Sequence, residues 1–270
     1  MAALNDDLSD SQDGHAAEAS SPTHTKSYPT VSRLNRALQN HLWLKELRTC
    51  QLAEVSAVDR ADARVELGWV HGRHPRLDDV DRVCRELGRF HGTLLTEALA
   101  PRLAELPGFA ESRVDALAAA MGNFSAPAQM RENVERFVLL CDQQLPQAIY
   151  KDSNLRNLVI EDETVTHLDY DDLTRAPIGY DLAKFLLSVS LTFGVSPPID
   201  AALAAYCDSA AVAGAERQLL GVPPGMVEAM LEINWLLTAP YAGANGYIHA
   251  HKTRRSVVEW WLDPRYHWSS

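Results

Sequence analysis

Three polar side chains that could act together in catalysis lie close to one another near the middle of the chain. Asp152 and Asn157 occupy a loop before one short apolar run, and Asp169 follows a second run. The runs, 158–160 and 165–168, are rich in β-branched residues and flank an acidic turn, which predicts a β-hairpin. Such a hairpin brings the loop before its first strand back to the end of its second strand. We therefore expect the three side chains to gather at one edge.

A cluster of this kind needs a cation. Two carboxylates about 4 Å apart repel each other by roughly 4 kcal/mol at an effective dielectric constant near 20. Mg²⁺ removes this repulsion and suits one or two carboxylates together with phosphate oxygens. Phosphoryl transfer uses such a set: one Asp orients the attacking hydroxyl and accepts its proton, while an Asn and a second Asp hold metal on the nucleotide phosphates.

Three successive motifs resemble those of the aminoglycoside phosphotransferase and choline kinase family. Residues 150–157 (YKDSNLRN) resemble the family's catalytic loop, and residues 168–171 (LDYD) resemble its metal-binding segment. Residues 177–183 (PIGYDLA) are similar to the start of the next helix, whose Asp braces the catalytic loop. Family members usually carry His where this chain has Tyr150. The resemblance is strong over about residues 145–190.

The resemblance implies an ATP- and Mg²⁺-dependent phosphotransferase that acts on a hydroxyl group of a small molecule. Asp152 would be the catalytic base, and Asn157 and Asp169 would be the Mg²⁺ ligands. Tyr150 and Asp181 would support the loop. The acceptor stays open among an aminoglycoside, a choline-like amine, a sugar and a nucleoside, and the oligomeric state is open too.

The resemblance also implies an α+β, protein-kinase-like fold with a small, reduced N-terminal lobe and a large, mainly helical C-terminal lobe. We divide the chain into a disordered acidic tail (1–25), an N-terminal lobe (26–75, with its hinge near 68–72) and a C-terminal lobe (76–270, with the catalytic loop at 149–172).

Within the N-terminal lobe, apolar periodicity predicts an amphipathic helix over 31–48 and strands over 52–58 and 64–70. By the resemblance, the backbone of Gly68 and Val70 would meet adenine.

The glycine-rich loop that the family places before this helix has no counterpart. Gly14 is the only glycine before Gly68, and Lys26 is the only lysine before the helix. By the resemblance, Lys26 would take the phosphate-contacting place, but Gln39, Asn40 and His41 stand where its acidic partner is sought. These departures leave a second function class open, a catalytically inactive kinase-like module that binds a nucleotide, a metabolite or a protein.

The C-terminal lobe carries further helical patterns, over 78–98, 112–121, 130–145, 180–193, 199–213 and 226–237. Glu228 and Glu232 stand one turn apart on the last of these. We expect a solvated acidic stripe there. The alternative, implied by the resemblance, is contact with an ammonium group of the acceptor. Asp171 is a further substrate candidate, or else it caps the turn after Asp169.

The pair Asp169-x-Asp171 after an apolar strand is also typical of haloacid-dehalogenase-type hydrolases. That motif should open a parallel βαβ domain. Here it lies past the middle of the chain, and mostly helical sequence follows it. We therefore reject this interpretation.

Composition and charge limit the classes of partner and the cellular location that we expect for the protein. The formal net charge is −11, and residues 1–25 supply −5 of it, which leaves −6 for the rest and argues against nucleic acid. No apolar run approaches 18 residues, so we expect no membrane span. The start of the chain lacks the pattern of a signal peptide. The cysteines form no Cys-x-x-Cys pair and predict free thiols in a reducing cytoplasm; they are Cys50, Cys84, Cys141 and Cys207.

Overall fold

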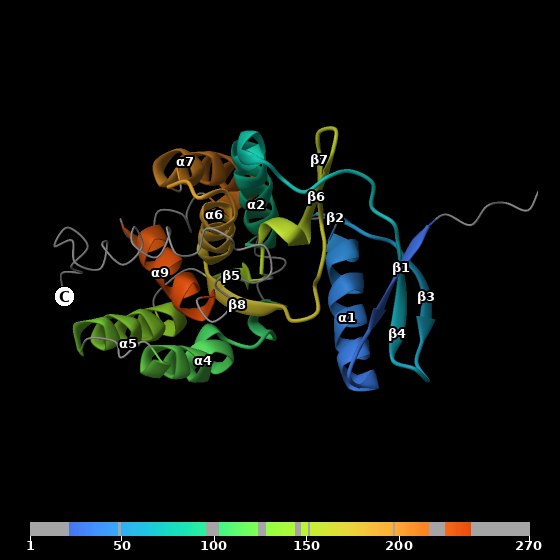
Figure 1. The fold of residues 1–270 in the computed structure, drawn as a ribbon, viewed down its shortest axis with the longest axis horizontal. Coiled ribbons are helices and arrows are strands. Elements are labelled where there is room, and N and C mark those ends of the chain that lie inside the picture. Colours follow the sequence, from blue (N-terminus) through green and yellow to red (C-terminus); the bar gives the residue numbers. More distant parts are fainter. Residues whose placement is uncertain are drawn as a thin grey trace, which may run out of the picture.

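The chain folds as a small group of strands with one helix, joined to a larger and mainly helical body (Figure 1). The computed structural model describes residues 22–47, 50–95, 103–123, 128–143, 147–150, 152–196, 198–215 and 225–238. This arrangement is the expected α+β division into a small N-terminal lobe and a large helical C-terminal lobe.

The N-terminal lobe is a three-stranded antiparallel sheet beside helix α1 (Val31–Leu47). The sheet order is β1 (Thr23–Ser27), β4 (Arg64–Gly68) and β3 (Val55–Asp59). The helix prediction is confirmed, and its C-terminal end reaches the other lobe. Trp43 and Leu44 join an apolar cluster that includes Leu94, Ile149 and Tyr170, so α1 is packed against both parts of the molecule.

Two strand boundaries differ from the sequence prediction. The predicted strand 52–58 is two strands, because β2 (Gln51–Leu52) pairs in parallel with β7 (Thr164–His167) of the C-terminal lobe before the chain enters β3. The predicted strand 64–70 ends at Gly68. The Trp69 N–H still donates to the carbonyl of Pro22, the next position in the register with β1, but proline has no N–H with which to return a bond.

Strand β1 also corrects the boundary of the predicted tail. Residues 23–25 belong to this strand, where Thr23 pairs with Gly68 and Lys26 pairs with Val65 across to β4. The remainder of the tail, residues 1–21, lies outside the described part of the chain.

The predicted hairpin is present and frames the centre of the molecule. Strands β6 (Leu158–Glu161) and β7 (Thr164–His167) are antiparallel neighbours, with β2 on the far side of β7. A second pair, β5 (Gln147–Tyr150) and β8 (Thr174–Pro177), lies before and after the hairpin in the chain. The segments between these four strands carry the residues expected to do chemistry.

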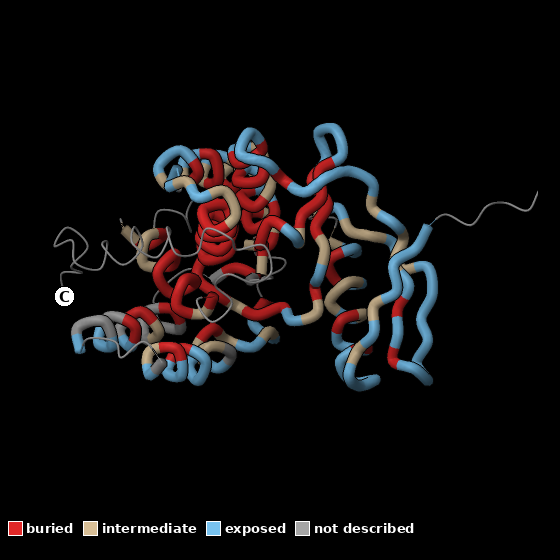
Figure 2. The backbone as a smooth tube through the Cα atoms, in the orientation of Figure 1, coloured by how far each residue is buried: buried red, intermediate tan, exposed pale blue. Residues whose placement is uncertain are grey.

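The C-terminal lobe is built around helix α6 (Tyr180–Phe193), whose residues 180–191 are all buried. Figure 2 shows this helix as a buried rod at the centre of the lobe. Around it lie the other predicted helices, which the structure confirms with small shifts at their ends: α2 (Val80–Leu94, preceded by the 3₁₀ turn η1, Leu77–Asp79), α4 (Phe109–Asn123), α5 (Ala128–Gln143), α7 (Ile199–Ala210, followed by the π-helical turn η3, Ala211–Ala215) and α9 (Met226–Thr238).

The connection between the lobes is fastened to the hairpin. The N–H and carbonyl of Arg73 bond to the carbonyl and N–H of Ile160, at 3.0 and 2.7 Å. The Arg73 guanidinium also holds Asp79 and lowers the pKa of that carboxyl. Gly72 permits this approach, because it has φ +118° and a Cβ there would lie 2.3 Å from the carbonyl oxygen of Ile160.

No described helix combines the length and the apolar character that crossing a bilayer requires. The four cysteines are free thiols, as the sequence predicts.

The close packing of α2 on α7 generates a stability prediction. A Cβ on Gly88 would lie 2.1 Å from the carbonyl oxygen of Tyr206, so Gly88→Ala should lower the free energy of unfolding by about 2 kcal/mol or more. Gly122→Ala is the matched control, since that helical glycine has no atom within 4 Å of its Cβ position and should gain roughly 0.5–1 kcal/mol. Urea unfolding measures both variants, and equal stabilities would contradict the packing described.

Candidate active site

The loop after β5 holds Asp152 in a strained conformation. Its φ is +68°, in the left-handed region, which costs an ordinary residue about 1–3 kcal/mol. Two neighbours stabilise this turn by bonding to the Asp152 carbonyl: the Asn154 N–H at 2.7 Å and the Asn157 side-chain amide at 2.8 Å. The sequence thus brings the predicted base and the predicted metal ligand Asn157 into direct contact.

Asp181 of α6 holds the same loop through a hydrogen bond to its backbone. It lies in the first turn of α6, it is 1% exposed, and its Oδ1 accepts the Ser153 N–H at 2.7 Å. His91 of α2 lies 3.8 Å from its other oxygen and bonds to the hydroxyl of Tyr206. This is the geometry that a bracing role requires. Tyr150 ends β5, and its side chain lies outside the described part of the structure.

The segment after β7 carries the second acidic group. Asp169 also has a left-handed φ, +64°, and the N–H of the preceding Leu168 bonds to the carbonyl of Asn157 at 2.8 Å. The predicted metal-binding segment is therefore hydrogen-bonded directly to the predicted catalytic loop.

Lys26 reaches this segment from β1. Its Nζ lies 2.9 Å from Asp169 Oδ1 and 2.7 Å from Asp171 Oδ2, and the hydroxyl of Tyr28 donates to Asp171 Oδ1 at 3.0 Å. Burial works against the ammonium, but the two carboxylates outweigh it and raise the pKa of Lys26. Lys26 therefore pairs with both acids of the segment, and Asp171 is a partner of the lysine together with Asp169.

Helix α1 holds the segment in a way that the sequence did not reveal. The Asn40 side chain donates to the carbonyls of Tyr170 and Asp171, at 2.9 and 3.0 Å, and Arg33 pairs with Asp172. Asn40 stands where an acidic partner for Lys26 is sought. Here the amide holds the backbone of the segment, and the acids of that segment meet the lysine.

The donor set fits a hard divalent cation. Carboxylate oxygens of Asp169 and Asp171 both lie within 2.9 Å of one ammonium nitrogen, so they already converge on a positive charge. The amide nitrogen of the Asn157 side chain donates to the carbonyl of Asp152, so the amide oxygen of Asn157 is the atom that could bind a metal. Within the described ranges, no group of three or more His, Cys, Asp or Glu could hold a metal. Phosphate oxygens and water would have to complete the shell, as Mg²⁺ favours.

The two backbone positions predicted to meet a nucleotide differ in what they can offer. The Gly68 N–H donates to the carbonyl of Glu54 at 2.7 Å, so this N–H is already used, and a contact of Gly68 with adenine stays a prediction. Val70 lies beyond the end of β4, half-buried in the connection between the lobes. A cavity next to Lys26 is bounded by apolar side chains of α1, β3 and β4, among them Ala37, Leu38, Val55 and Leu67.

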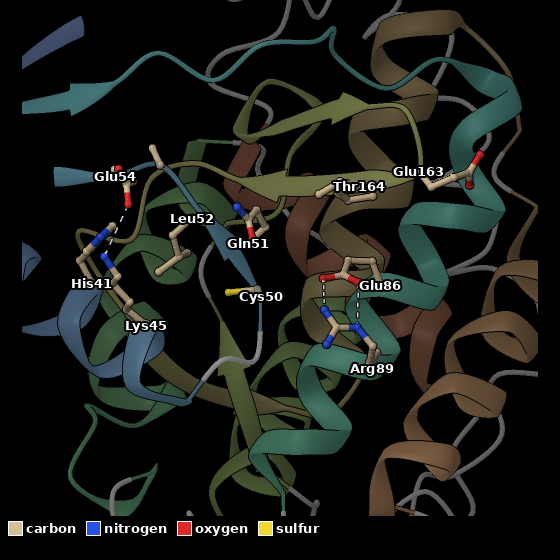
Figure 3. A pocket seen from close by; sticks show the side chains of 12 residues that line it. His41, Lys45, Cys50, Gln51, Leu52, Glu54, Glu86, Arg89, Glu163 and Thr164 are labelled. Atoms are coloured by element: carbon tan, nitrogen blue, oxygen red, sulfur yellow. Dashed lines mark hydrogen bonds and ion pairs between the residues drawn. The ribbon is translucent and has the colours of Figure 1, made fainter. Parts of the chain in front are cut away.

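A second cavity, of about 640 Å³, lies between α1, β2, α2 and the turn of the hairpin (Figure 3). It shares His41 and Ala53 with the cavity beside Lys26. Its wall carries the ion pair of Glu86 and Arg89, whose nitrogens approach the carboxylate to 3.0 and 2.6 Å. None of the three predicted catalytic and metal-binding residues lines it, and it adjoins the candidate active site only through the residues that it shares with the cavity beside Lys26.

Sequence and structure comparisons point to one family. The model of the phosphotransferase enzyme family matches residues 26–219, most of the chain. The chain belongs to the phosphotransferase enzyme family. This membership confirms the resemblance noted in the sequence and assigns the protein to the small-molecule kinases and phosphotransferases. No curated protein matches the sequence.

Solved structures of this phosphotransferase's relatives share its fold. A choline/ethanolamine kinase family protein from Mesorhizobium loti superposes with a TM-score of 0.59 at 14% identity, over 90% of this chain and 84% of that one. The macrolide 2′-phosphotransferase MphH from Brachybacterium faecium gives 0.52 at 16% identity, over 90% and 84%. Amicoumacin kinase hAmiN, solved with AMP-PNP, Ca²⁺ and Ami, gives 0.54 at 12% identity, over 89% and 79%. These likenesses confirm the protein-kinase-like fold.

The acidic residues of α9 do not form the solvated stripe that we expected. Glu232 is 4% exposed, and burial raises its pKa to about 10, so it is neutral near pH 7. Glu228 is half-buried. The expectation fails because residues 230–236 of α9 are buried all round, whereas periodicity alone assigns a polar side to the helix.

One residue near the base was missed in the sequence. The Nζ of Lys184, on α6, lies 3.3 Å from Asp152 Oδ1. A lysine within a mostly apolar helix was the available signal, since such a side chain is rarely buried without a partner.

The pKa of Glu232 gives a pH-dependent prediction. Because the folded-state pKa is raised above the ordinary 4.5, the neutral carboxyl supports the folded state fully below that value, and the support is lost as the pH rises toward about 10. Glu232→Gln should therefore be more stable than wild type by about 3 kcal/mol at pH 7 and nearly equal to it near pH 4.

Denaturant titrations across this pH range measure the difference, with Glu111→Gln on the exposed face of α4 as the control. A less stable Glu232→Gln variant at pH 7 would show that this phosphotransferase pairs Glu232 with a cation.

Proposed function

We propose that the protein transfers the γ-phosphoryl group of ATP, with Mg²⁺, to a hydroxyl group of a small molecule. The observation that carries the proposal is the meeting of Lys26 with Asp169 and Asp171 beside the loop of Asp152 and Asn157. A lysine, two acids and an amide at one place are the groups that bind nucleotide phosphates and their metal.

Each residue then takes a role that its contacts support. Asp152 is the base, because its carboxylate is 45% exposed at the surface of the loop and can reach an acceptor hydroxyl. Asn157 and Asp169 would hold Mg²⁺, which when bound neutralises the charge of the nucleotide phosphates. Lys26 turns from the carboxylates to the phosphates, and Asp181 keeps the loop in place through Ser153.

The nucleotide base is assigned to the connection between the lobes. The N–H of Gly68, at the end of β4, already bonds to the carbonyl of Glu54, so we propose Val70 as the main backbone position that meets adenine. The free thiols also fit an enzyme of the cytoplasm, a compartment that keeps thiols reduced and contains ATP.

The acceptor is proposed as a hydroxylated small molecule, and an amine is one class to test. Glu228 and Glu232 lie on α9, the helix whose last residue, Thr238, contacts Lys184 near the base. A buried neutral carboxyl such as Glu232 would ionise on meeting an ammonium group, which releases a proton. Asp171 is placed with the phosphate-binding groups, because Lys26 and Tyr28 engage it.

The test is a screen of ADP formation from Mg-ATP across choline, ethanolamine, an aminoglycoside, a macrolide, sugars and nucleosides. Phosphorylated acceptor identified by mass spectrometry supports the proposal. ATP binding without product for any acceptor would favour the inactive binding module instead.

Asp152→Asn gives the sharpest mutational prediction. The variant keeps the size of the side chain, so it should remain folded and bind Mg-ATP with nearly unchanged affinity. Its kcat should fall by about 10²- to 10⁴-fold, because a general base acts on the transition state rather than on nucleotide binding. Steady-state kinetics and calorimetry on the same preparation measure both quantities, and a variant with wild-type kcat would remove Asp152 from the mechanism.

A further inference from the structure

A buried lysine lies against the proposed base. Lys184 is on α6 three residues after Asp181 and is 9% exposed. Its Nζ is 3.3 Å from Asp152 Oδ1 and 3.0 Å from the hydroxyl oxygen of Thr238 on α9. Neither the catalytic-loop motif nor the metal-binding segment contains this residue.

Burial of an ammonium group at this position costs desolvation free energy, which a charged partner must offset. Among the residues that the structure describes, Lys184 contacts one carboxylate, that of Asp152, and one hydroxyl, that of Thr238. Its neighbours along α6, Leu182, Ala183 and Phe185, are buried apolar side chains. A methionine would pack there as well, so packing alone does not account for the charge.

The contact matters because of how Asp152 is held. Its backbone is in the left-handed region, and its carboxylate is nearly half exposed on a loop. Lys184 holds Oδ1, and the Asn154 side chain holds Oδ2 at 3.2 Å. Each carboxylate oxygen has two lone pairs, so a single contact of this kind does not by itself stop the oxygen from accepting a hydroxyl proton. An ammonium fixed by a buried helix therefore limits rotation of the carboxylate.

We infer that Lys184 is a positioning residue, which keeps the Asp152 carboxylate oriented toward the acceptor hydroxyl. The inference rests on the proposed phosphoryl transfer. Lys184 acts through Asp152, and Thr238 fixes the lysine in turn, so α6 and α9 both support the base. A correctly oriented base contributes to rate through geometry, and loss of orientation appears in kcat.

Lys184→Met tests the inference. Its kcat should fall by about ten- to a hundredfold, while the KM for ATP and the calorimetric affinity for Mg-ATP change by less than about twofold. The thermal midpoint should be unchanged or higher, because water can reach the exposed Asp152 once the ammonium is gone. A residue with only a structural role would lower the midpoint and leave kcat of the folded fraction unchanged.

Lys45→Met is the matched control. Lys45 is 60% exposed on α1, and its Nζ lies 4.0 Å from Glu54 at the second cavity. Removal of this charge should leave kcat, KM and stability unaltered. Thr238→Val is a milder second variant, which releases the lysine without removing its charge and should give a smaller loss of kcat.

The double variant Lys184→Met with Asp152→Asn decides whether the lysine acts through the base. If it does, the double variant is as slow as Asp152→Asn alone. Multiplied losses would show that Lys184 acts on the substrate independently, and an unchanged kcat in Lys184→Met would also overturn the inference. Wild type without product for any acceptor defeats the proposed function itself, which separates that failure from this one.

Discussion

The pairing of Lys26 with Asp169 and Asp171 is the contact on which the rest of the site depends. The lysine belongs to β1 of the small sheet, and the two acids follow β7 of the central hairpin, so the contact joins segments that are 143 residues apart in the chain. A lysine at this place offsets the repulsion between two neighbouring carboxylates, which otherwise favours separation. Asn40 of α1 secures the same segment through its backbone, so the small lobe holds the acidic segment by charge and by hydrogen bonds.

The loop of Asp152, the proposed catalytic loop, is held by hydrogen bonds within the C-terminal lobe. Asp152 and Asp169 both adopt left-handed backbone conformations, which are stable only where surrounding bonds fix them. The Asn157 side chain donates to the carbonyl of Asp152, and the Asp181 carboxylate accepts the N–H of Ser153. The N–H of Leu168, the residue before Asp169, donates to the carbonyl of Asn157. The two acids therefore sit at opposite ends of a short hydrogen-bonded circuit. Strain in such a circuit is expected where side chains must be presented to a substrate rather than packed.

Sequence reasoning succeeded where local pattern determines structure. The hairpin and the helices follow from apolar periodicity and turn residues, and Lys26 could be singled out because no other lysine precedes α1. It failed where the outcome depends on distant partners. Gln51–Leu52 and Val55–Asp59 read as one strand, but they pair with different sheets. Glu232 looked solvent-facing because periodicity does not reveal which faces other helices cover, and Lys184 meets Asp152 only through the tertiary placement of α6.

The central claim is that Lys26 occupies the cation position between Asp169 and Asp171 until a nucleotide and its metal arrive. Metal binding to Lys26→Met measures this most directly, with Mn²⁺ as the probe and the free ion followed by electron paramagnetic resonance. Mn²⁺ alone should bind several-fold more tightly to the variant than to wild type, because the competing ammonium is gone, whereas Mg-ATP should bind about tenfold more weakly because a phosphate contact is lost. Mn²⁺ binding that is unchanged or weaker in the variant would contradict the account.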